Sequence, residues 1–148
     1  MERDPRDAEI ERLVRQLTLL VRRSRKVART LAAQVHPEVD AGAYAVLLLI
    51  AEAGGLRLVD VAEELGLDKS TMSRQLGQLV RLGLLTRRPD PEDRRAFRLE
   101  LTDSGAQRLA EVTRERRAAW RERLAQWPDE DVAALADGLA RLARDLPG

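Results

Sequence analysis

Positive charges and hydrogen-bond donors are concentrated in one stretch of the chain. Between Lys69 and Arg98 there are eight basic and three acidic residues, a net charge of +5, whereas all 148 residues together have a formal net charge of +1. Guanidinium and ammonium groups bind phosphate oxygens, and a guanidinium can also grip both acceptors on the edge of a guanine. Phosphate binding requires charge that is polarised in this way, so this stretch is the candidate binding surface.

The residues around these charges predict a helix, a tight turn and a second helix. Gly66 lies where the first helix must end, because glycine tolerates the left-handed backbone of such a stop. Asp68 can cap the second helix by accepting hydrogen bonds from its first N–H groups. Inward-facing residues recur at helical spacing: Leu65, Leu67, Met72, Leu76 and Leu79. This layout is that of a helix-turn-helix.

A basic hairpin follows the second helix. Residues 84–88 and 98–102 have the pattern of two strands joined by a charged turn, the wing. In a helix-turn-helix that reads DNA, N-terminal residues of the second helix meet base edges in the major groove. The alternative is that the arginines form only a solvated face. That reading leaves their coincidence with the second helix and the wing unexplained.

Within the second helix, some residues suit base reading and others suit positioning. The first two turns are expected to expose six polar side chains: Lys69, Ser70, Thr71, Ser73, Arg74 and Gln78. We predict Arg74 for direct base reading, because its guanidinium can bond both acceptors of guanine. Gln75 could read adenine or be solvated. The hydroxyl side chains suit phosphates and the helix start, with capping alone as the alternative for Ser70 and Thr71.

Apolar stripes mark both ends of the chain. A first helix is predicted from Asp4 to His36, and it carries apolar residues at intervals of three and four. The last helix has a similar seam, typical of a helix packed against a partner helix: Val132, Leu135, Leu139, Leu142 and Leu146. The terminal helices could cover each other within one chain. A homodimer explains more, because it also places two reading heads side by side.

Start and stop signals predict the remaining elements. These are a helix at 40–52, a brief strand at 56–58 that pairs with the wing, and a long helix at 103–127. Asp40 can cap the first of these helices. Pro128 ends the long helix and begins the last one, whose first residues are acidic and suit the positive end of the helix dipole.

Composition excludes several classes of protein. The chain has no cysteine and one histidine, His36, which leaves no nucleophile–base pair of the usual kinds and no thiolate zinc site. There is no glycine-rich phosphate loop and no cluster of metal-ligating residues, so we expect no enzyme, no metal and no cofactor. The N-terminus carries no secretion signal, and no apolar run approaches the ~18 residues of a membrane span. We therefore expect a cytoplasmic protein with no membrane partner.

From about Leu17 to Leu146 the chain resembles the MarR family of dimeric winged-helix transcription regulators. The most specific parts of the likeness are residues 68–74, 83–87, 90–95 and the Leu-Thr-x-x-Gly start of the long helix at 101–105. One departure is the helix that begins near Leu58, which lacks the Ser or Thr cap often found in relatives.

The resemblance implies a mainly α fold with a small β-hairpin wing: a winged helix-turn-helix with N- and C-terminal dimerisation helices. Residues 1–148 would form a single domain, with the DNA-binding part at about 40–102 and the dimerisation helices at 4–36 and 103–147. The two chains would form a triangular homodimer.

The resemblance also assigns roles in the wing. Asp93 and Arg95 would brace the hairpin, and Arg94 would enter the minor groove, where the negative potential attracts a guanidinium. The roles of Arg94 and Arg95 could be exchanged. The arginines of the wing strands would touch phosphates or be solvated: Arg87, Arg88 and Arg98.

We therefore expect a sequence-specific DNA-binding transcriptional regulator, a repressor that acts as a homodimer on an inverted repeat in double-stranded DNA. The alternative is a winged-helix module for protein contacts, or an antirepressor, without DNA binding. Such a module would not need Lys69, Arg74 and Arg94 at positions that face a groove.

Relatives commonly bind small anionic or aromatic effectors in a crevice between the dimer lobe and the winged part, and lose DNA affinity when occupied. Candidate lining residues here are Arg29, His36, Tyr44 and Trp120. Two of these have a simpler alternative. His36 could be a helix-end residue, and Trp120 could serve dimer packing.

Overall fold

The computed structural model describes residues 4–146, which form six helices and three strands. Along the chain these are α1 (Pro5–Val35), α2 (Ala41–Ala53), β1 (Leu56–Arg57), α3 (Leu58–Leu65), α4 (Lys69–Arg81), β2 (Leu85–Pro89), β3 (Phe97–Leu101), α5 (Asp103–Leu124) and α6 (Asp129–Asp145). Residues 1–3, part of the stretch in which the sequence predicts no secretion signal, lie outside the described residues. So do residues 147–148, which include the end of the predicted C-terminal dimerisation segment.

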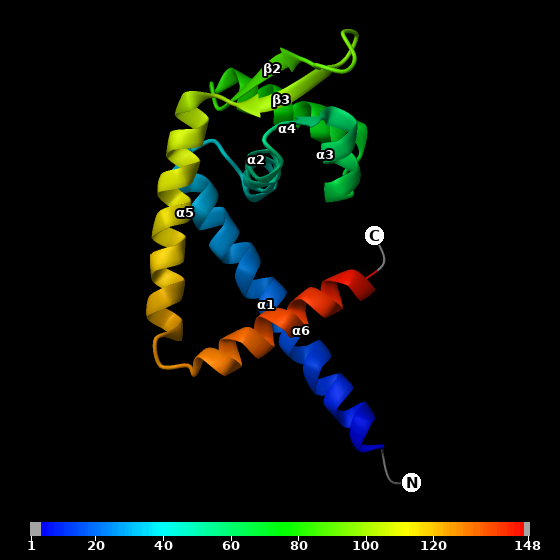
Figure 1. Ribbon diagram of the computed structural model, residues 1–148, viewed down its shortest axis with the longest axis vertical. Helices are drawn as coiled ribbons and strands as arrows, with labels where there is room; N and C mark the ends of the chain where they lie inside the picture. The colour runs from blue at the N-terminus through cyan, green and yellow to red at the C-terminus, as the bar shows by residue number, and fades with distance from the viewer. Residues whose placement is uncertain (1–3, 147–148) are drawn as a thin grey trace.

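One end of the molecule is a winged unit, which consists of α2, α3, α4 and the three-stranded antiparallel sheet (top of Figure 1). The sheet has the order β1-β3-β2, with Leu56 opposite Leu99 and Arg87 on the other side of Leu99. The predicted pairing of a brief strand with the wing is confirmed. That strand is one residue shorter than predicted, because Leu58 already begins α3.

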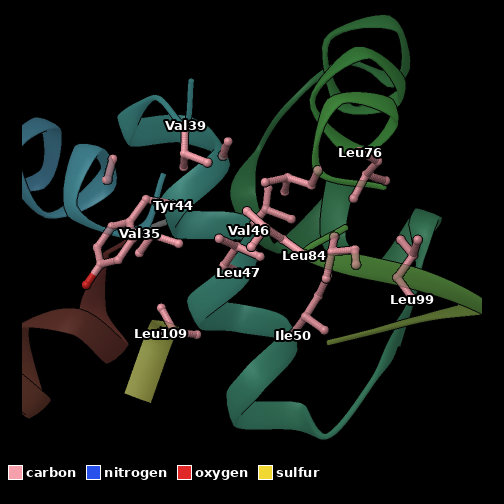
Figure 2. Close-up of a cluster of buried hydrophobic side chains, with 14 of the residues drawn as sticks. Val35, Val39, Tyr44, Val46, Leu47, Ile50, Leu76, Leu84, Leu99 and Leu109 are labelled. Carbon is pink, nitrogen blue, oxygen red and sulfur yellow. The ribbon is translucent and has the colours of Figure 1, made fainter. Parts of the chain in front are cut away.

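The apolar side chains of α2 hold the winged unit together. Val46, Leu47 and Ile50 are fully buried and lie among residues of α4, the turn after it and the sheet, including Leu84 in that turn and Leu99 in β3 (Figure 2). The predicted inward face of α4 is confirmed, because Met72, Leu76 and Leu79 have no exposed surface. Burial of this apolar area is the main term that fixes α4 against α2.

Three further helices, which we call the lobe helices, extend away from the winged unit: α1, α5 and α6 (Figure 1). α5 ends at Leu124, three residues before the predicted end at Trp127, and Pro128 then precedes α6 as expected. α6 has no buried residue, and its seam residues Leu135 and Leu139 are 48% and 42% exposed. The terminal helices therefore do not cover each other within one chain. No helix among the described residues is long and apolar enough to cross a membrane.

Candidate nucleic-acid interface

The start of α4 is held by Asp68, as predicted. One oxygen of its carboxylate accepts a hydrogen bond from the backbone N–H of Thr71 at 2.9 Å, and the other accepts one from the Thr71 hydroxyl at 2.6 Å. These bonds favour the charged carboxylate and lower the pKa of Asp68. The Thr71 hydroxyl is therefore used in the cap, which is the alternative role that the sequence left open for it.

Beyond the cap, α4 presents a row of polar side chains to solvent. Lys69, Ser70, Ser73 and Arg74 are exposed. None of the four side chains has a hydrogen bond or ion pair within residues 4–146, so their donors are available to a ligand. They belong to the first two turns of the helix, the part of a recognition helix that meets base edges.

Two glutamines of α4 do not belong to this row. Gln78, which the sequence predicts to be exposed and to contact DNA, is half-buried, and its amide donates a hydrogen bond to the carbonyl oxygen of Glu38 at 2.6 Å. Gln75 is also half-buried and packs against Gly42, and its side-chain oxygen is buried with no hydrogen-bond partner. Neither prediction for Gln75, base reading or solvation, describes its position.

The wing has a short, hydrogen-bonded tip that exposes two arginines. The N–H of Asp90 donates to the carbonyl oxygen of Ala96 at 3.0 Å, and the Ala96 N–H donates to that of Asp93 at 2.9 Å. These bonds close the turn that carries Arg94 and Arg95, both of which are exposed and without a side-chain partner among the described residues. Either guanidinium is free to enter a groove.

The pair expected to brace the hairpin is not an ion pair. The Asp93 carboxylate accepts a hydrogen bond from the backbone N–H of Arg95 at 2.9 Å, and no described contact joins it to the Arg95 guanidinium. The interaction is a local turn bond between near neighbours in sequence. Asp93 therefore shapes the tip of the wing but does not tie the wing to the rest of the winged unit.

Arg57 and Asp90 supply that tie. The Arg57 Nε donates to the Asp90 carboxylate at 2.7 Å, and the N–H groups of Glu92 and Asp93 donate to its other oxygen at 2.8 and 3.1 Å. The hydrogen bond from Arg57 is the main cause of a pKa of Asp90 far below its ordinary value, and burial opposes it. The same pair raises the pKa of Arg57. Sequence reasoning missed both residues.

The arginines of the wing strands differ in what they touch. Arg87 is exposed, whereas Arg88 forms a long ion pair of 3.8 Å with Glu100. Arg98 was expected to touch phosphates or be solvated, but it is half-buried and donates to the carbonyl oxygen of Gly55 at 2.6 Å. Arg98 therefore joins β3 to the turn before β1.

The Leu-Thr-x-x-Gly motif fastens α5 to the base of the wing. Thr102 donates through its hydroxyl to the carbonyl oxygen of Gly83 at 2.6 Å and accepts from the N–H of Gly105 at 3.0 Å. A Cβ at Gly105 would collide with the carbonyl oxygen of Leu84, so the helix can approach this backbone only through a glycine.

The four candidate effector-binding residues are not brought together. Tyr44 is 3% exposed, and its hydroxyl accepts a long hydrogen bond of 3.4 Å from Arg116. His36 accepts the N–H of Glu38 on Nδ1 at 3.1 Å, which makes it a helix-end residue. Arg29 is exposed on α1, and Trp120 is 50% exposed on α5.

Three grooves lie beside α5, and the two largest differ in the residues that line them. One, of about 410 Å³ between α1 and α5, includes Trp120 alone among the four candidates. The other, of about 600 Å³, lies between α2 and α5, with Leu48, Leu101 and Leu109 on its walls. Four arginines and a glutamate also line it: Arg114, Arg116, Arg117, Arg121 and Glu52.

Helix-turn-helix, wing and lobe helices together define the class of the fold, a winged helix-turn-helix with helical extensions at both ends. Comparison of the sequence with known proteins points to one family within this class. Residues 39–96 match the sequence profile of the MarR family. The match extends from the start of α2 to the turn of the wing, so this part of the chain is similar in sequence to the MarR family.

Individual relatives are consistent with this similarity. The chain is 31% identical over 101 residues to YdgJ, an uncharacterised HTH-type transcriptional regulator of Bacillus subtilis. The aligned residues cover 68% of this chain and 62% of that relative. It is 34% identical over 88 residues to a putative transcriptional regulatory protein for the hcr operon of Thauera aromatica, covering 60% of this chain and 52% of that protein. Both alignments span less than two thirds of the relative.

The fold extends further than these alignments. The crystal structure of the MarR family transcription regulator SP03579 superposes with a TM-score of 0.81 at 20% identity, covering 94% of this chain and 91% of the other. The likeness therefore includes lobe helices as well as the winged unit.

Proposed function

We propose that the chain is a sequence-specific, DNA-binding transcription regulator that acts as a homodimer. The observation that carries the proposal is the row of exposed, unpaired donors on the first two turns of α4, Lys69, Ser70, Ser73 and Arg74. A helix of this kind fits the major groove, and Arg74 has the group best suited to guanine. The proposal implies double-stranded DNA as partner and the cytoplasm as location.

The wing would act beside it in the minor groove. Arg94 and Arg95 are free at a tip that hydrogen bonds hold in shape, and a guanidinium is favoured where the minor groove is narrow. Arg87 and Arg88 on β2 would contact phosphates. Lys69 and the serines of α4 would do the same, and base discrimination would rest mainly on Arg74.

Dimerisation through the lobe helices supports this use of the winged unit. The apolar seam of α6 exposes Leu135, Leu139 and Leu146, and α1 carries a comparable stripe in which Ile10, Leu13 and Val14 are about half exposed. Burial of these residues against a second copy would remove a large apolar surface from water. The dimerisation segments would be residues 4–36 and 103–147, and the DNA-binding part about 40–102.

A repressor released by a small effector is the form of regulation we propose. The 600 Å³ groove between α2 and α5 supports it, because apolar walls and a rim of arginines suit a small anionic or aromatic molecule. The residues first expected to line such a site do not line this groove. Titration with a small aromatic carboxylate, followed by the fluorescence of Trp120 and Trp127 and by operator binding, tests the proposal.

Selection of genomic fragments by the purified protein tests DNA binding itself. The selected fragments should share an inverted repeat with half-site centres about 34–36 Å apart, one turn of the double helix. Arg74→Ala should weaken binding by about 1–3 kcal/mol and relax preference at one base pair in each half-site. Arg23→Ala, which removes the same charge from exposed α1, is the matched control.

The outcomes separate the proposal from its rival. A chain that selects no fragment, or an Arg74→Ala variant that selects the same sequences with the same affinity, would favour a winged-helix module for protein contacts. A single asymmetric site protected by one chain would contradict the homodimer.

A further inference from the structure

A glutamine on one flank of α4 bonds this helix to the segment that follows α1. The amide of Gln78 donates to the carbonyl oxygen of Glu38 at 2.6 Å, across 40 residues of sequence. Glu38 lies in the α1–α2 junction, residues 36–40. The bond therefore joins the helix proposed to read DNA to the end of a lobe helix, without passing through the apolar core.

The carbonyl that accepts this bond is held in place. The Glu38 N–H donates to Nδ1 of His36 at 3.1 Å, and the Val39 N–H donates to the carbonyl oxygen of His36 at 3.0 Å. Val39 is buried in the core. The α1–α2 junction is thus a hydrogen-bonded turn that the buried side chain of Val39 anchors in the core. It can therefore fix the position of a side chain that binds to its backbone, as Gln78 does.

A second glutamine on the same side of α4 makes the fit closer. Gln75 precedes Gln78 by three residues, so the two side chains lie on one face of the helix. Gln75 packs against Gly42 in the first turn of α2, and a Cβ at that glycine would collide with its amide group. The side of α4 that carries Gln75 and Gln78 is therefore matched in shape to the start of α2 and bonded to the α1–α2 junction.

The α1–α2 junction also receives a contact from the other direction. Arg108 of α5 donates to the carbonyl oxygen of Val35, the last residue of α1, at 3.3 Å. Residues 35–40 thus lie between α5 and α4, with a side chain from each helix bonded to their backbone. A hydrogen bond has a preferred direction, so it restricts rotation of α4 in a way that apolar packing does not.

We infer that Gln78 is a positioning residue, which sets the orientation of α4 relative to the lobe helices and thereby the half-site spacing that the dimer accepts. This inference rests on the proposed function. It assigns Gln78 no contact with bases: its donor is already bound, and its role is exerted through Glu38. The residue determines which spacing is bound, whereas Arg74 determines which base is preferred.

The test compares operators that differ only in spacing. Wild type, Gln78→Met, Gln78→Lys and the control Gln107→Met, which alters an exposed glutamine of α5, are titrated on the selected inverted repeat with zero, one or two base pairs added or removed at its centre. Gln78→Met should bind the preferred spacing about three- to tenfold more weakly, the range expected for one hydrogen bond. It should also discriminate less between spacings, with base preferences unchanged.

The other variants sharpen the result. Gln78→Lys keeps a donor that can reach the Glu38 carbonyl, so the spacing profile should stay narrow, and Gln107→Met should match wild type. If Gln78→Met does not fold, Gln78→Asn, whose shorter side chain cannot span the same distance, takes its place. A changed preference at one base pair with an unchanged spacing profile would make Gln78 a DNA contact and overturn the inference. A profile identical to wild type would overturn it as well.

A measurement without DNA keeps the inference separate from the proposed function. Because the chain has no cysteine, Ala33→Cys on α1 and Arg81→Cys on α4 can be labelled specifically with spin labels. Labelled chains are diluted with unlabelled ones, so that distances within one chain dominate. The distribution should be narrow in wild type and broad with Gln78→Met. Equal distributions would refute the inference even if DNA binds, and failure of wild type to bind DNA would refute only the proposed function.

Discussion

Asp90 is 4% exposed and yet charged, and the geometry around it explains how the winged unit accommodates that charge. Its carboxylate accepts three hydrogen bonds, one from the Arg57 guanidinium and two from backbone N–H groups of the wing. A buried charge is tolerated only when it is paired and hydrogen-bonded in this way. A single carboxylate therefore holds both the turn of the wing and its attachment to β1.

This arrangement predicts a dependence of stability on pH. Because the pKa of Asp90 is lower in the folded chain than in the unfolded one, the unfolded chain takes up the proton first as acid is added. The contribution of Asp90 should be complete above about pH 5 and should be lost progressively as the pH falls below its ordinary pKa of about 3.9. The difference in melting temperature between wild type and Asp90→Asn should be constant above about pH 5 and should narrow steadily from there to about pH 2.5.

The control for this titration is Glu64→Gln, which removes an exposed carboxylate of α3. Its melting temperature should follow that of wild type across the range. A constant difference between Asp90→Asn and wild type at all pH values would show that the carboxylate contributes through packing alone.

Asp90→Asn should also change the affinity for DNA, and two explanations predict changes in opposite directions. Simple electrostatics predicts tighter binding, because a negative charge near phosphates is removed. Loss of the attachment to Arg57 predicts weaker binding, by about three- to tenfold, since the wing would lose its fixed position. Fluorescence anisotropy at two salt concentrations measures the affinity of this variant for its operator.

Arg94→Ala, measured in the same way, should weaken binding and reduce the dependence of affinity on salt concentration, because fewer counterions are released.

At the scale of elements, the start of α5 lies directly against the backbone of Gly83 and Leu84 at the base of the wing. Thr102 bonds the carbonyl oxygen of Gly83, and Gly105 allows the first turn of α5 to lie against Leu84. The spacing between the wing and the glycine is therefore fixed by contact geometry. Only Thr102 separates β3 from α5, and its hydrogen bonds fix the direction in which α5 begins.

Gly105→Ala should destabilise the chain by about 1–3 kcal/mol, the usual cost of forcing a methyl group into a packed site. Gly77→Ala is the matched control, because a Cβ at Gly77 in α4 meets no atom within 4 Å. That change should raise stability by about 0.5–1 kcal/mol, since alanine favours the helix. Chemical denaturation of both variants without DNA measures the difference, and equal stabilities would refute the proposed contact.

Local signals predicted the elements well, because a cap or stop involves residues only two to five positions apart. Asp68 and Gly66 illustrate this, as a helix start and a helix end that depend on their own neighbours. Arg57 and Asp90 are 33 residues apart, and Gln78 and Glu38 are 40 apart. Contacts between residues so far apart leave no periodic pattern in the sequence. The ion pair between Arg57 and Asp90 and the hydrogen bond of Gln78 therefore could not be predicted.

For the molecule as a whole, the seam of α6 has no apolar partner within a single chain, because no residue of this helix is buried. Leu135→Glu combined with Leu139→Glu should convert a dimer to monomers and abolish specific DNA binding, as should deletion of residues 128–148. Ala133→Glu is the control, because residue 133 lies on the opposite side of α6 from Leu135. Sedimentation and operator titration measure both effects. A double variant that stays dimeric and binds with unchanged affinity would contradict the assignment of the interface.

α5 has a mechanical consequence that follows from its length and its fixed beginning. Its 22 residues span about 33 Å, from the base of the wing to the turn before α6. A rigid rod of that length is a lever: a tilt of about 5° at one end displaces the other by about 3 Å, close to the ~3.4 Å that separates successive bases along a strand. A displacement among the lobe helices that is smaller than the width of a side chain, if it tilts α5, would therefore shift the winged unit by nearly the distance between successive bases.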